Sequence, residues 1–198
     1  MITERDNTII KEWFEPYKYA TIGQIEKAYF RDQQYSYEIA RKRLLEMSKA
    51  GFIKPYRDVA TNRNVYILKD DKIKPPSFHR IIILGVLAEM KYCGFNVEFF
   101  KIEMPWMGGR IISDAFVIFT IKNRRYHFFI ETQLSKHGHY LDKYDTLKQS
   151  GEVQKFLGKE HFPRIIFISD MEYSDVHINS TEVIKLDTKL NAFPSILI

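Results

Sequence analysis

Cysteine is almost absent from this chain of 198 residues, in which Cys93 is the one thiol. A single thiol excludes an intrachain disulfide and a cysteine-rich zinc site. Long apolar runs are also lacking, because the longest, at 81–88, is far too short to cross a bilayer. The first twenty residues are charged throughout and do not resemble a secretory signal. We therefore expect a soluble, cytoplasmic protein without a membrane partner.

Motifs for small-molecule chemistry are missing as well. The chain has no glycine-rich phosphate loop, no Ser–His–Asp arrangement and no cofactor fingerprint. It also has no internal repeat and no low-complexity segment. These absences argue against a nucleotide-dependent enzyme and against a small-molecule cofactor.

Apolar residues are plentiful, at 45% of the chain, which is enough for a packed core. Lysine and arginine number 30 against 25 acidic residues, for a net charge of +5. Residues 1–75 hold 15 basic and 11 acidic residues, whereas residues 76–198 hold 15 and 14. A mild excess of this kind permits a nucleic-acid partner without proving one, and most of it lies in the N-terminal part.

The N-terminal part has the pattern of a winged helix-turn-helix. A glycine at Gly51 marks the end of the third expected helix, and Ser36 is expected to cap its start. Two extended runs then indicate a hairpin. The expected helices cover 3–17, 22–30 and 35–51, and the expected strands 52–58 and 64–69. We assign residues 1–74 to a winged-helix DNA-binding domain.

The third helix carries three successive basic residues, which fan around it so that those facing solvent can meet phosphates or base edges in a major groove. The hairpin adds polar residues suited to the neighbouring DNA backbone. The predicted contacts to double-stranded DNA are Arg41, Lys42, Arg43, Arg57, Asn62 and Arg63. Two alternatives stay open. The basic stretch could be an ordinary solvated helix face, and winged helices also bind other proteins.

Pro75-Pro76 marks a linker over 70–78, because consecutive prolines continue neither a helix nor a central strand. Beyond it, residues 79–198 predict a second domain of mixed α/β class. The expected order is a helix, three strands, a helix, a strand and a further strand near the end. A strand–helix–strand crossover beside an antiparallel hairpin implies a mixed sheet flanked by helices.

The hairpin over 110–133 carries the residues that could do chemistry. Side chains alternate along a strand, so Glu131 and Gln133 share one face, and counting from the turn places Asp114 across from them. Two carboxylates and an amide carbonyl offer the hard oxygens that Mg²⁺ prefers. Further polar residues could supply an acid or bind phosphates, namely Glu89, Lys136, Lys143, Tyr144 and Lys148.

Asp114 followed by Glu131-x-Gln133, with this order of elements, resembles the PD-(D/E)xK nuclease superfamily. The resemblance implies Asp114, Glu131 and Gln133 as catalytic residues and Asp114 and Glu131 as Mg²⁺ ligands. Over about residues 5–170 the chain also resembles the replication-relaxation family of plasmids and conjugative elements in Gram-positive bacteria. The stretches that carry this second resemblance are YATIGQIEKAYF, SYEIARKRLLEMSKAGFI, NVYIL, SDAFVIF, FFIETQ and LDKY.

Gln133 stands where the nuclease motif has lysine, and Ser113 stands where the motif often has proline. Glutamine cannot supply a positive charge. Some members of the superfamily use glutamine, others have lost activity, and a helix lysine such as Lys143 or Lys148 can replace the motif lysine.

Three functions follow from these patterns. The first is a DNA-binding protein of a plasmid or other mobile element, acting in replication, transfer or their regulation, with a degenerate nuclease-like domain. The second is an active Mg²⁺-dependent DNA endonuclease. The third is a protein-interaction adaptor. The sequence leaves a homodimer open.

Structural roles compete with the chemical ones at each residue. Asp114 could cap a loop, and a buried Glu131 needs a partner, for which Arg124, Arg125 and Lys136 are candidates. His137 and His139 fit an exposed turn better than a metal pair. Trp106 is either part of a mobile loop or a buried anchor.

Overall fold

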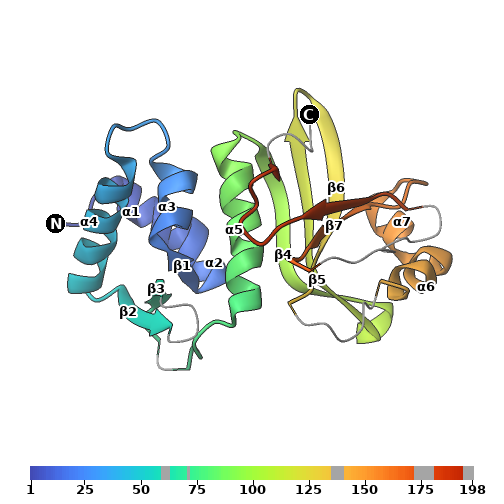
Figure 1. Cartoon of the computed structure of the whole chain (residues 1–198), viewed down its shortest axis with the longest axis horizontal. Coiled ribbons are helices and arrows are strands. Elements are labelled where there is room, and N and C mark those ends of the chain that lie inside the picture. The colour runs from blue at the N-terminus through green and yellow to red at the C-terminus, as the bar shows by residue number, and fades with distance from the viewer. Residues whose placement is uncertain (59–62, 71, 135–140, 172–180, 194–198) are drawn as a thin grey trace. The chain divides into compact units, whose positions relative to one another are not determined.

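The computed structural model describes residues 1–58, 63–70, 72–134, 141–171 and 181–193 (Figure 1). The chain has the mixed α/β composition that the sequence predicts. It forms two compact units, Met1–Gly94 and Phe95–Ile198. Within the described ranges, no helix combines the length and the hydropathy needed to span a bilayer.

The first unit contains helices and a three-stranded antiparallel sheet of order β1-β3-β2. The expected helices and strands are present, and the short strand β1 is added to them. Three residues are too few to show an alternating pattern, so β1 could not be seen in the sequence. Its elements are α1 (Glu4–Ile9), the π-helical η1 (Ile10–Phe14), α2 (Glu15–Tyr17), β1 (Tyr19–Thr21), α3 (Ile22–Tyr29), α4 (Ser36–Lys49), β2 (Ile53–Asp58), β3 (Arg63–Leu68) and α5 (Phe78–Tyr92).

Helix boundaries in this unit follow local chemistry, with one exception. Thr21 and Gln24 form a capping box at the start of α3. Gly51, with φ 83°, ends the segment after α4 as expected. The expected Ser36 cap is wrong. Tyr35, with φ 60°, precedes α4 and makes no capping bond, and the Ser36 hydroxyl donates to Glu26 Oε1 at 2.7 Å.

Helix α5 packs along α3 in the first unit. Gln24 Nε2 donates to the carbonyl of Ile81 at 2.7 Å, and Lys27 forms an ion pair with the buried Glu89. The two compact units therefore divide after Gly94, whereas the sequence suggested a boundary at the Pro75-Pro76 linker. Composition locates a linker, but it does not tell which neighbour an apolar helix will contact.

The second unit is built on a five-stranded mixed sheet of order β4-β5-β6-β7-β8. The first three strands are antiparallel, and β6, β7 and β8 run parallel. The crossover and the extra strand are as expected. Its elements are β4 (Asn96–Trp106), the 3-10 turn η2 (Met107–Gly109), β5 (Ile111–Ile121), β6 (Arg124–Thr132), α6 (Lys143–Ser150), α7 (Glu152–Leu157), β7 (Arg164–Ile168) and β8 (Val183–Leu186).

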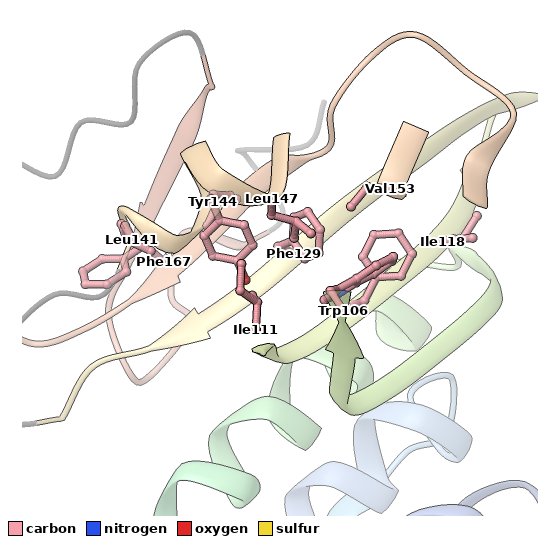
Figure 2. Packing of buried hydrophobic residues seen from close by; sticks show 11 residues of the cluster. Trp106, Ile111, Ile118, Phe129, Leu141, Tyr144, Leu147, Val153 and Phe167 are labelled. Atoms are coloured by element: carbon pink, nitrogen blue, oxygen red, sulfur yellow. The ribbon is translucent and has the colours of Figure 1, made fainter. Parts of the chain in front are cut away.

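Helices α6 and α7 cover one face of this sheet. Gly151, with φ 69°, separates them. Figure 2 shows their buried side chains gathered against those of the strands, with Tyr144, Leu147 and Val153 facing the sheet residues. Trp106 is 2% exposed and lies in this cluster, which makes it a buried anchor.

Candidate functional site

The hairpin of β5 and β6 is held by a two-residue turn, Lys122-Asn123. Both residues have positive φ, 46° and 64°, which matches the twist of a tight antiparallel hairpin. The register runs from Ile121 paired with Arg124 to Ala115 paired with Ile130. Continued by one residue, this register sets Asp114 opposite Glu131, as counting from the turn predicted.

The sheet forks at this point. The pairing of β5 with β6 ends at Ala115 and Ile130. On the N-terminal side of Ala115, β5 is still paired with β4, and on the C-terminal side of Ile130, β6 is still paired with β7 through Glu131 and Thr132. Backbone groups at such a fork lose their partners in the ladder and need others. We call the position of Asp114 and Glu131 the fork.

The two carboxylates supply the missing hydrogen-bond partners. The backbone N–H of Asp114 donates to Glu131 Oε1 at 3.1 Å. In return, the backbone N–H of Thr132 donates to Asp114 Oδ2 at 2.7 Å, and the Thr132 hydroxyl donates to the same oxygen at 3.1 Å. Each carboxylate thus accepts a hydrogen bond from a backbone N–H on the opposite strand. Both residues therefore have a structural role, whether or not they take part in catalysis.

Helix α6 brings two further groups to Glu131. Lys143 Nζ donates to Glu131 Oε2 at 2.9 Å, and the Tyr144 hydroxyl donates to Glu131 Oε1 at 2.5 Å. Lys143 also donates to the carbonyl of Ile112 at 2.9 Å. Glu131 therefore pairs with Lys143 rather than with Arg125, which pairs with Glu98 at 2.8 Å.

Tyr144 is fully buried, and its ring centre lies 4.7 Å from that of Phe129 (Figure 2). The buried Ser113 hydroxyl accepts from Trp106 Nε1 at 3.3 Å and donates to the carbonyl of Met104 at 3.4 Å. The sequence named Tyr144 as a phosphate contact, whereas its observed contacts are internal.

Burial dominates the electrostatics of the fork. Burial raises the pKa of Glu131, the negative charge of Asp114 raises it further, and Lys143 and Tyr144 oppose the shift. Burial also raises the pKa of Tyr144 well above its usual value, and the charge on Glu131 adds to this effect. An acid with a raised pKa beside a second acid is a common feature of functional sites, although structural networks produce it too.

Gln133 lies just beyond the end of β6 and is partly buried. Its backbone N–H donates to the carbonyl of Ile168 at 2.9 Å, and its carbonyl accepts from the Ser169 hydroxyl at 2.8 Å. These bonds hold Gln133 to β7. Lys136, His137 and His139 lie outside the described residues.

The contacts at the fork do not suit a bound Mg²⁺. Asp114 and Glu131 have oxygens of the right kind. However, both Glu131 oxygens and Asp114 Oδ2 already accept N–H or O–H groups, and Lys143 already supplies a positive charge. An ion that used these oxygens would compete with those donors and would be repelled by the ammonium of Lys143.

The predicted DNA contacts separate into different environments. Arg41 and Lys42 are exposed on α4, and Arg41 pairs with Glu38 at 2.8 Å. Arg43 turns inward, where its Nε donates to the fully buried Asp6 at 2.9 Å. Arg57 is exposed on β2. Only the backbone of Arg63 is described, and Asn62 lies outside the described residues.

The hydrogen bonds of Ser113, Thr132 and Trp106 could not be inferred from the sequence. Thr132 bonds to Asp114 at the fork, and Trp106 donates to Ser113 between the neighbouring strands β4 and β5. Both arrangements depend on strand pairing and leave no local sequence pattern. Comparison of the chain with protein-family models, with curated proteins and with solved structures found no match. The resemblances to the replication-relaxation and nuclease families therefore stay predictions.

Proposed function

We propose that the first unit is a winged helix that binds double-stranded DNA. The observation that carries this proposal is the order of its elements, helix, strand, helix, helix, strand, strand, with β2 and β3 forming a hairpin on a three-stranded sheet. In helix-turn-helix proteins, the second helix of the motif, which directly follows the turn, enters the major groove. Here that helix is α4.

Two basic side chains on α4 are available for such contacts. Ala40, Leu44 and Met47 are buried, whereas Arg41 and Lys42 face solvent. The Arg41–Glu38 pair is exposed, with side chains 55% and 60% accessible, so its release costs little. Arg57 on β2 is a further candidate for the DNA backbone. We assign Arg43 to the pair with Asp6 and not to DNA.

The second unit supplies the rest of the proposal. We infer that it is a degenerate nuclease-like domain, in which Asp114 and Glu131 now satisfy the fork rather than a metal. The resemblance described above suggests that the protein serves a plasmid or another mobile element in replication, transfer or their regulation. A homodimer on DNA would appear as two chains per duplex in sedimentation.

DNA binding is tested by fluorescence anisotropy on duplexes at several salt concentrations. Replacing Arg41 and Lys42 by alanine should weaken binding about tenfold and lower the salt slope by about 0.9 for each phosphate that the protein no longer neutralises. The matched control is Lys101→Ala with Lys155→Ala, which removes the same charge from exposed sites in the second unit and should leave binding nearly unchanged. Failure of the wild type to bind any duplex would contradict the proposal and favour the adaptor.

An active Mg²⁺-dependent endonuclease is the second candidate. One observation favours it, because Lys143, 2.9 Å from Glu131, brings the positive charge that Gln133 lacks. The hydrogen bonds already made by the carboxylates argue against it, and we rank it second. Nicking of supercoiled plasmid with Mg²⁺ or Mn²⁺, abolished by Asp114→Ala and by Glu131→Ala, would establish it.

A further inference from the structure

Lys143 bridges the two strands of the fork. Its ammonium donates to Glu131 Oε2, at the end of β6, and to the carbonyl of Ile112, near the start of β5, both at 2.9 Å. A carboxylate oxygen and a backbone carbonyl are the kinds of ligand that a hard divalent cation takes. The ammonium therefore sits between oxygens that would otherwise suit a metal ion.

Tyr144 fixes the remaining oxygen of Glu131. Its hydroxyl is 2.5 Å from Glu131 Oε1, and its ring is fully buried. Because Lys143 and Tyr144 are consecutive residues at the start of α6, one helix holds both oxygens of the carboxylate. Glu131 cannot turn toward a new ligand unless these contacts break.

Asp114 is engaged in a similar way. Its Oδ2 accepts from the backbone and the side chain of Thr132, at 2.7 and 3.1 Å. A divalent ion that approached both acids would compete with these donors. It would also meet the ammonium of Lys143 at short range, where two positive charges in a partly buried site repel strongly.

We propose that Lys143 is the built-in cation of the fork, whose ammonium takes the place of a divalent metal at the Asp114–Glu131 pair and keeps metal out. This proposal goes beyond DNA binding and does not depend on it, because it concerns metal affinity in the absence of DNA. It differs from the second candidate function, in which the same site needs a metal.

The test is Mn²⁺ binding to the full chain, measured by isothermal titration calorimetry. Lys143→Met removes the ammonium and keeps most of the apolar stem, so it should raise Mn²⁺ affinity by about tenfold or more over the wild type. Lys143→Arg, which keeps the charge, should behave like the wild type. Lys148→Met, on the same helix, is the matched control for loss of a lysine.

A second substitution tests whether the added Mn²⁺ affinity arises at the fork. Adding Glu131→Gln to Lys143→Met should abolish the new binding, because it removes the charge of one of the two carboxylates of the fork and leaves Asp114 alone. Lys143→Gln provides a second neutral variant in case the methionine variant does not fold. Equal Mn²⁺ affinity in the wild type and in a folded neutral variant would overturn the proposal. The wild type alone can also overturn it, if it binds Mn²⁺ and Glu131→Gln weakens that binding tenfold.

Discussion

Asp6 on α1 of the first unit and Glu131 on β6 of the second are buried acids, and each pairs with a basic side chain from a different element. Asp6 accepts from Arg43 of α4 and from the backbone and hydroxyl of Thr3, at the N-terminus of α1. Glu131 accepts from Lys143 and Tyr144 of α6 and from the backbone of Asp114. The two sites are therefore similar in their numbers of donors.

Their electrostatic outcomes are opposite. Burial on its own would raise the pKa of Asp6. The hydrogen bonds from Arg43 and Thr3 and the positive charge of Arg43 outweigh burial, so the pKa of Asp6 is lowered. At Glu131 burial and the neighbouring Asp114 prevail, and the pKa is raised. The difference teaches that a similar set of donors does not lower the pKa of Glu131, because burial raises it most and the charge of the second acid, Asp114, raises it further. Of these two sites, only the fork has the unfavourable charge pair often found at functional sites.

The largest expected effect is at Arg43. Arg43→Met should destabilise the protein by about 3 kcal/mol, because it leaves the buried Asp6 without its counter-charge. Lys42→Met, at the neighbouring exposed position, should change stability by less than about 0.5 kcal/mol. Urea unfolding measures both. Equal effects of the two substitutions would contradict the structural assignment of Arg43.

Tyr144→Phe is expected to have the next largest effect. It removes a buried hydrogen bond to an acidic side chain and should cost about 2 kcal/mol. Tyr126→Phe is the control, because the Tyr126 ring stacks on Phe119 with centres 5.5 Å apart and a phenylalanine keeps that contact. The same urea titration compares them. If Tyr144→Phe were as mild as the control, the hydroxyl would not be holding Glu131.

The smallest effect, and the sharpest contrast, is in pH dependence. The lowered pKa of Asp6 means that its stabilising contribution is present above the ordinary value of 3.8 and is lost as pH falls through the folded-state pKa. The raised pKa of Glu131 means that the fold is favoured below the ordinary value of 4.5 and loses stability as pH rises through the folded-state pKa. The two acids therefore respond to pH in opposite directions.

Chemical unfolding between pH 3 and 8 separates the two acids. Asp6→Asn should be most destabilising near neutral pH and less so as pH falls below 3.8. The free energy of unfolding of Glu131→Gln should increase relative to that of the wild type as pH rises above 4.5. If the stability of the two variants relative to the wild type changed with pH in the same way, the two acids would not respond to pH in opposite directions.

Much of the secondary structure could be predicted from the sequence. The capped start of α3, the glycine after α4 and the break at Gly151 each depend on a few neighbouring residues. The turn at Lys122-Asn123 set the register, and counting from it placed Asp114 across from Glu131. These features are local, so the sequence contains the information needed to infer them.

Tertiary structure decided the rest. It turned Arg43 inward to Asp6, placed α5 against α3, and brought Lys143 rather than Arg125 to Glu131. It also forked the sheet beyond Ala115, which gave both acids backbone partners. The physical reason is the same in each case. A buried charge or an unpaired backbone group takes the partner that packing brings within reach, and packing joins residues from distant parts of the chain.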